Sequence, residues 1–155
     1  IKQGEKLLLK DAKEYIIDDA ELERVYKSYP VMWKDASAKP TLCFIGCPHL
    51  TYSQLCGWTD AITGALETAG KTKVAVPTVL TASPAVCQKF KKTEGYAKLT
   101  AMGARLSSIC PLMYTNNPLT KRRRIITNSN KLRTYSRSRY YLDEKILALI
   151  TGKEV

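Results

Sequence analysis

Short apolar runs alternate with segments of helical periodicity over most of this 155-residue chain, and this alternation constrains its fold more than any other feature. Residues 41–45 form an uninterrupted apolar run, which is typical of a strand buried on both faces. Residues 50–69 then carry apolar side chains at helical spacing and are followed by Gly70, which favours a helix end. The same reasoning predicts strands over residues 73–80, 104–109 and 123–127. It predicts helices over residues 18–28, over 84–102 with a break near Gly95, and directly after residues 128–129. A last helix is predicted over residues 144–150, with Asp143 as its cap.

The order of these elements predicts an α/β fold with three αβα layers and a mostly parallel sheet of about four strands. In such folds, ligands bind at the carboxyl ends of the strands. Those ends carry cysteines and small hydroxyl side chains, which we expect to converge on one edge of the sheet. The segments concerned are residues 46–49, 81–83, 107–110 and 127–129.

Five cysteines, an odd number, occur in a chain without a signal-peptide pattern, which favours metal binding or catalysis over disulfide bonds. Cys47 and Cys110 each follow a predicted strand and precede a proline. Two thiolates from separate loops suit a metal or an iron–sulfur cluster, although spacing alone equally allows two unrelated cysteines. The remaining three are interpreted as small buried hydrophobic residues: Cys43, Cys56 and Cys87.

His49, the single histidine, lies two residues from Cys47. Its position before a predicted helix suits a helix cap, and its position beside Cys47 suits hydrogen bonding to a substrate or proton transfer. Residues 127–129 are small and polar at a strand-to-helix turn, where backbone and hydroxyl donors can hold an anion. Lys131 and Arg133 then place positive charge at the start of a helix, against the dipole preference, and such a conflict is expected where an anion binds.

The net charge of +11 suggests a second class of function, a nucleic-acid-binding domain. Eight of the 25 basic residues lie between Lys121 and Arg139, where no acidic residue occurs. The first four, residues 121–124, also suit the solvated edge of a strand. Because the sequence lacks a recognition-helix or aromatic stacking motif, a local site for a small anion is favoured over nucleic acid.

No apolar run approaches the roughly 20 residues that span a bilayer, so a cytoplasmic protein without a membrane partner is expected. The chain begins with Ile1 rather than Met, and we interpret it as part of something larger.

Four stretches together resemble aconitase X, the divergent branch of the aconitase superfamily. Residues 43–50, with the turn Gly-Cys-Pro-His, resemble the family's signature. Residues 81–83, 108–113 and 127–131 are similar, in the family's order, to its Thr-Ser-Arg, second Cys and Asn-Ser-x-Lys elements. Pro84 stands where the family usually has Arg, a loss that Arg133 can offset. The resemblance implies that residues 1–155 are a single aconitase-like α/β domain, the C-terminal part of a large subunit.

By this resemblance the protein is part of an iron–sulfur hydro-lyase that dehydrates a small hydroxy acid such as mevalonate 5-phosphate or cis-3-hydroxyproline. Cys47 and Cys110 would ligate a [4Fe–4S] or [2Fe–2S] cluster, with the third ligand outside this chain, and His49 would be catalytic. The anionic substrate would be bound by Ser83, Thr127, Asn128, Ser129, Lys131 and Arg133. The rest of the large subunit and a small swivelling subunit or domain, the source of the general base, would be partners, so the isolated chain is expected to be inactive. A non-catalytic aconitase-like structural domain is the remaining alternative.

Overall fold

The computed structural model describes residues 4–118, 120 and 122–153, and the chain divides into two compact units, Ile1–Pro30 and Val31–Val155. None of the helices in these described ranges combines the length and apolar character that crossing a bilayer requires.

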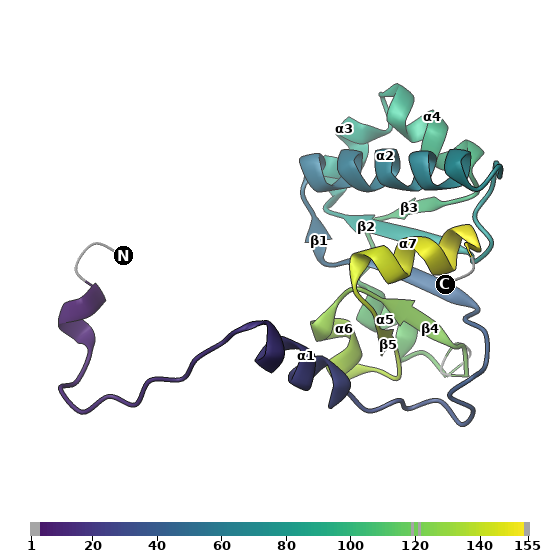
Figure 1. Ribbon diagram of the computed structural model, residues 1–155. Helices are drawn as coiled ribbons and strands as arrows, with labels where there is room; N and C mark the ends of the chain where they lie inside the picture. The colour runs from purple at the N-terminus through teal and green to yellow at the C-terminus, as the bar shows by residue number, and fades with distance from the viewer. Residues whose placement is uncertain (1–3, 119, 121, 154–155) are drawn as a thin grey trace. The chain divides into compact units, whose positions relative to one another are not determined.

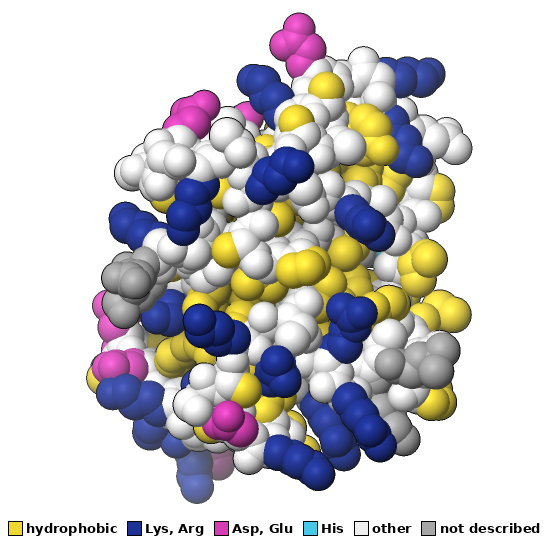
Figure 2. All heavy atoms as spheres, turned by 90° about the vertical axis from the view of Figure 1, so that its right-hand side faces the viewer, with side chains coloured by type: hydrophobic (Ala, Val, Ile, Leu, Met, Phe, Trp, Pro, Cys, Tyr) yellow, Lys and Arg dark blue, Asp and Glu magenta, His cyan; other side chains and the backbone are white. Residues whose placement is uncertain are grey.

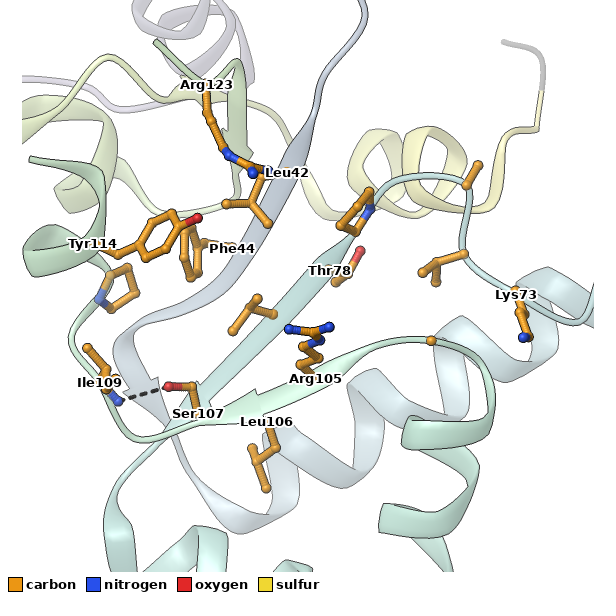
Figure 3. A pocket seen from close by; sticks show the side chains of 16 residues that line it. Leu42, Phe44, Lys73, Thr78, Arg105, Leu106, Ser107, Ile109, Tyr114 and Arg123 are labelled. Carbon is orange, nitrogen blue, oxygen red and sulfur yellow. Dashed lines mark hydrogen bonds between the residues drawn. The ribbon is translucent and has the colours of Figure 1, made fainter. Parts of the chain in front are cut away.

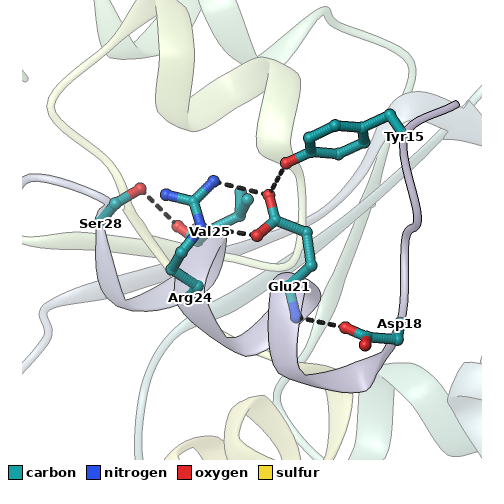
Figure 4. Close-up of polar contacts among 6 residues, drawn as sticks. All are labelled: Tyr15, Asp18, Glu21, Arg24, Val25 and Ser28. Atoms are coloured by element: carbon teal, nitrogen blue, oxygen red, sulfur yellow. Dashed lines mark hydrogen bonds and ion pairs between the residues drawn. The ribbon is translucent and has the colours of Figure 1, made fainter. Parts of the chain in front are cut away.

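The first unit contains a short 3-10 helix, η1 (Gly4–Leu7), and one α-helix, α1 (Asp19–Lys27), which confirms the helix predicted over residues 18–28. Asp18 caps α1, because its carboxylate accepts a hydrogen bond of 2.8 Å from the backbone N–H of Glu21 (Figure 4). The Glu21 carboxylate accepts hydrogen bonds from Arg24, at 2.6 Å, and from the Tyr15 hydroxyl. These hydrogen bonds, with Arg24 as the larger cause and Tyr15 as the next, lower the pKa of Glu21 from 4.5 to about 2.

The second unit is a five-stranded, entirely parallel sheet in the order β3-β2-β1-β4-β5, with helices on both faces (Figure 1). This arrangement confirms the predicted parallel αβα fold, with five strands instead of about four. The elements are β1 (Leu42–Leu50), α2 (Tyr52–Thr68), β2 (Thr78–Ala82), α3 (Pro84–Phe90), α4 (Glu94–Ala101), β3 (Arg105–Ser107), α5 (Pro111–Thr115), β4 (Ile125–Thr127), α6 (Asn130–Tyr135), β5 (Arg139–Tyr140) and α7 (Asp143–Thr151).

The two faces of the sheet carry two separate hydrophobic cores. Cys43 and Ile45 of β1 point to the core that α2, α3, α4 and α7 cover. Leu42 and Phe44, one residue out of step, point to a smaller core beneath α5 and α6. Figure 1 shows α2, α3 and α4 beside β2 and β3, and α5 and α6 beside β4 and β5. Both faces of β1 are therefore buried, as its continuous apolar run predicts.

Local signals in the sequence fix the helix starts. At α2, Thr51 accepts a hydrogen bond from the Gln54 N–H at 3.2 Å, and the Gln54 side chain accepts one from the Thr51 N–H at 2.9 Å, which makes a capping box. At α3, Ser83 is the N-cap and Pro84 takes the first helical position.

Several details differ from the sequence prediction. β1 extends to Leu50, whereas β3 and β4 are shorter than predicted. β2 begins at Thr78, directly after Pro77, and residues 73–77 are irregular. The break between α3 and α4 comes before Gly95, where the Thr93 hydroxyl donates to the Phe90 carbonyl at 2.7 Å. Asp143 does not cap α7 but lies in its first turn and accepts a hydrogen bond of 2.9 Å from the Asn128 side chain. The short elements α5 and β5 were not predicted.

Candidate functional site at the carboxyl edge of the sheet

The predicted site residues follow parallel strands and therefore lie toward one edge of the sheet. The turn that contains Cys47 is in the last part of β1, Thr81 is in β2, and Thr127 ends β4. Because β2 and β4 are the two neighbours of β1, side chains from both strands can reach the Cys47 turn.

Gly46 makes this turn possible. Its φ of +104° is a conformation that residues with a side chain rarely adopt. A Cβ atom at this position would collide with the Thr81 carbonyl oxygen and would lie 2.9 Å from Leu50 Cγ. The peptide bond from Cys47 to Pro48 is cis. The turn therefore needs a glycine directly before the cysteine.

Two buried hydroxyl groups hold the backbone on either side of Cys47. The Thr81 hydroxyl donates a hydrogen bond to the Gly46 carbonyl, and the Ser129 hydroxyl donates one to the Cys47 carbonyl. Thr81 is 0% exposed and Ser129 is 6% exposed. The sequence suggested a hydroxyl cluster here but not its use in anchoring the Cys47 turn. The signal that could have found it is the position of Thr81 on β2 and of Ser129 directly after β4, the two strands adjacent to β1.

The Cys47 thiol belongs to the smaller core, with Leu42, Phe44 and Leu132, and the residue is 8% exposed. Cys110 is half-buried at the N-cap of α5, after β3, so that β2 separates its strand from β1. Within the described ranges, no group of three His, Cys, Asp or Glu side chains could hold a metal ion. Cys47 and Cys110 are thus the cysteines that lie at or directly after a strand end.

The other cysteines divide into two kinds. Burial raises the pKa of the Cys43 thiol far above its usual range, and it raises that of Cys87 as well. The Cys87 sulfur lies 3.4 Å from the Ala82 carbonyl oxygen. The interpretation of these two as small buried residues is confirmed. Cys56, on α2, is only half-buried.

The small polar residues after β4 are engaged with one another. The Thr127 hydroxyl, fully buried, accepts a hydrogen bond of 3.1 Å from the Ser129 N–H. Asn128 donates to Asp143, and the Ser129 hydroxyl also accepts a bond of 2.9 Å from the Leu132 N–H, which caps α6. These side chains therefore shape the turn between β4 and α6.

The charged candidates lie on α6. Lys131 is exposed, and no described acidic side chain pairs with it. Arg133 is half-buried, and its Nε donates to the Asn130 side chain at 2.9 Å. Lys131 is thus the cation most accessible to an anion at this turn.

Ser83 and His49 complete the predicted set. Ser83 is half-buried, and its hydroxyl accepts a hydrogen bond of 3.4 Å from the Val86 N–H at the start of α3. His49 is exposed, and the suggestion that it caps α2 is wrong, because Thr51 is the N-cap. Its imidazole is therefore not committed to the helix.

The basic stretch between residues 121 and 139 serves partly as structure. Lys121 lies outside the described residues, and Arg122 and Arg123 are exposed. Arg124 donates from Nε to the Lys39 carbonyl at 2.6 Å, and Arg139 donates to the Ala36 carbonyl at 2.7 Å. Both arginines therefore anchor the loop that precedes β1.

Positive charge nonetheless dominates the second unit, which has 19 basic and seven acidic residues. No acidic residue occurs between Glu94 and Asp143. On the face in Figure 2, lysine and arginine side chains surround a hydrophobic area, and acidic side chains are few. This surface is suited to anions.

Comparison with known proteins matches most of the second unit. The family model described as the aconitase X third domain matches residues 40–148. The crystal structure of Thermococcus kodakaraensis aconitase X in its holo-form is similar to this chain, with a TM-score of 0.66 and 23% sequence identity. The match covers 90% of this chain and 35% of that chain, so this chain spans about a third of its solved relative. No curated protein matches.

Proposed function

Because this chain belongs to the aconitase X family, we propose that it forms the third-domain part of an iron–sulfur hydro-lyase that dehydrates a small anionic hydroxy acid. Mevalonate 5-phosphate and cis-3-hydroxyproline are the substrate types that this family suggests. One observation carries the proposal: a hydroxyl group on β2 and a hydroxyl group in the turn after β4 hold the backbone at Cys47, at the edge where parallel sheets bind ligands.

Cys47 and Cys110 are proposed as two cluster ligands, each at a strand end and each followed by a proline. When bound, the cluster would act as a Lewis acid toward the hydroxyl group that leaves. The hydrogen bonds from Thr81 and Ser129 support this role for Cys47, since a ligand is best held by a rigid backbone. The third ligand would come from outside this chain.

Substrate binding is assigned to the turn between β4 and α6, together with Ser83. Lys131 and Arg133 would neutralise the carboxylate or phosphate of the substrate. Thr127, Asn128 and Ser129 would form the turn that binds the substrate, and their hydrogen bonds would hold it in shape. The hydrogen bond from Ser129 to the Cys47 carbonyl would also link this turn to the Cys47 turn. His49, exposed and two residues from Cys47, would exchange a proton with the substrate.

The remaining parts of the active site would be supplied by the rest of the large subunit and by a small swivelling subunit or domain. Since the chain spans about a third of its solved relative, we expect no turnover by the isolated 155-residue chain.

The cluster assignment can be tested in the complete protein, assembled with its other domains and purified without oxygen. Cys47→Ser and Cys110→Ser are expected to lower the bound iron and abolish the visible absorption of the cluster. Cys56→Ser is the matched control, because Cys56 is half-buried within α2 and does not directly follow a strand. A colourless, iron-free parent protein, or equal iron in all three variants, would contradict the assignment.

A further inference from the structure

The sheet of the second unit is covered unequally. Fully parallel sheets occur almost only where both faces are covered. Here α2, α3, α4 and α7 cover one face, whereas on the other face α6, with α5 beside it, packs on β1, β4 and β5. A groove of about 810 Å³ remains along β2 and β3 on that second face. The covering layer is therefore incomplete in the part of the fold described by this chain.

The floor of the groove is apolar. Leu42 and Phe44 of β1, Val79 of β2 and Tyr114 of α5 line it. Figure 3 shows Phe44 and Tyr114 together at one side, with their rings 5.3 Å apart in an edge-to-face arrangement. Leu42 and Phe44 are buried and Val79 and Tyr114 are half-buried, whereas Ile109, which also lines the groove, is 62% exposed. Exposed apolar surface next to such a floor typically marks a site of interaction with another protein.

The rim of the groove is positively charged. Lys73, Arg105 and Arg123 line it and are exposed, and Figure 3 shows Arg105 projecting from β3 across from Phe44. No acidic side chain is among its described lining residues. An occupant with an apolar face and acidic flanks would match both the floor and the rim.

We propose that this groove receives an acidic, amphipathic polypeptide segment from another domain or subunit of the aconitase X assembly. Such a segment would complete the missing layer of the αβα fold. The solved relative contains about two thirds of its chain outside the matched region, so polypeptide is available for this role. A nucleic acid would satisfy the cations but would leave the apolar floor without a partner.

Binding can be tested with the full chain and three synthetic helical peptides of about 18 residues, which is roughly 27 Å of helix. The first carries a leucine stripe flanked by glutamates. The second has serine in place of each leucine, and the third has lysine in place of each glutamate. Measured by fluorescence anisotropy, the first is expected to bind at least about tenfold more tightly than the other two. No binding of the first peptide, or equal binding of the first and second, would overturn the proposal.

Charge-reversal variants locate the binding surface. The double change Lys73→Glu with Arg105→Glu is expected to weaken binding of the first peptide about tenfold or more. The double change Lys91→Glu with Lys92→Glu alters the total charge equally at exposed positions outside the groove and serves as control. Equal losses in the two variants would mean non-specific attraction and would also overturn the proposal.

Covering of the groove in the complete protein can be read by hydroxyl-radical footprinting. Tyr114, in the groove, is expected to be oxidised more slowly in the assembled protein than in this chain. Tyr96, half-buried on α4 against the opposite core, is the internal reference. Unchanged oxidation of Tyr114 would show that no other domain covers it. None of these measurements depends on a bound cluster, so their outcome is separate from that of the proposed activity.

Discussion

At the residue scale, the chain turns sharply within the last part of β1. Gly46 allows this turn, and the hydroxyl groups of Thr81 and Ser129 hold it in place. The glycine supplies the left-handed backbone, and the hydroxyls satisfy the two carbonyl groups that the turn directs away from the strand ladder. Each feature can be removed by a single substitution, so their contributions can be measured separately.

Gly46→Ala is expected to lower the free energy of unfolding by about 3 kcal/mol, because alanine disfavours this φ and its Cβ would collide with Thr81. Gly57→Ala is the matched control: Gly57 lies in α2 and a Cβ there meets nothing within 4 Å. It is expected to raise stability by about 0.5–1 kcal/mol. Urea denaturation of both variants tests this, and similar stabilities would contradict it.

Ser129→Ala removes the N-cap of α6 and the hydrogen bond to the Cys47 carbonyl, and we expect a loss of about 2 kcal/mol. The Cys47 turn should loosen, so that iodoacetamide modifies Cys47 faster while Cys43, 0% exposed on the same strand, stays unmodified. Mass spectrometry of the alkylated chain distinguishes the two thiols. Ser53→Ala, at an exposed position of α2, should change neither quantity.

In the first unit, the lowered pKa of Glu21 makes its contribution to α1 dependent on pH. A depressed pKa in the folded state means that the stabilisation is complete above the unfolded value of 4.5 and is lost as pH falls toward about 2. Arg24→Gln should raise the pKa of Glu21 back toward 4.5, since Arg24 is its main cause. Carboxyl-carbon NMR titration measures the shift, and an unchanged Glu21 titration would contradict this cause.

At the scale of elements, the sequence predicts the helices and strands whose pattern lies within one continuous and sufficiently long stretch of residues. The apolar run of β1 and the cap and periodicity of α2 indicate both elements directly. β5 could not be predicted, because Arg139 and Tyr140 become a strand only by pairing with β4. The five residues of α5 are too few to show periodicity. The rule that ligands bind at the carboxyl ends of parallel strands predicts that the site residues lie at one edge. It could not predict the hydrogen bond from the Ser129 N–H to the Thr127 hydroxyl.

The start of α2 offers a test of one such local signal. Thr51→Ala should lower the free energy of unfolding by about 1 kcal/mol, because it breaks the capping box with Gln54. Thr68→Ala, an exposed threonine at the other end of the helix, is expected to change it by less than about 0.5 kcal/mol. Thermal unfolding followed by circular dichroism compares them, and equal effects would argue against the capping box.

At the scale of the whole molecule, some of the basic side chains stabilise the fold and others are exposed to solvent, where they can attract an anionic partner. Arg139 lies 5.0 Å from the centre of the Tyr141 ring and 5.8 Å from that of Trp33, besides its bond to the Ala36 carbonyl. Arg122 is exposed. A total of +11 therefore overstates the charge that is available to partners.

Arg122→Gln and Arg139→Gln remove the same charge from these two settings. Both should lower the salt concentration at which the chain elutes from a cation-exchange column. Only Arg139→Gln should lower the thermal midpoint, because it loses ring contacts and a loop anchor worth about 1–2 kcal/mol together. A lower midpoint for Arg122→Gln would contradict this division.

The two edges of the sheet bear on how copies of this chain behave at high concentration. β3 and β5, the edge strands, are three and two residues long. Such short edges offer few free backbone groups for a strand from another molecule, which limits growth of the sheet into fibrils.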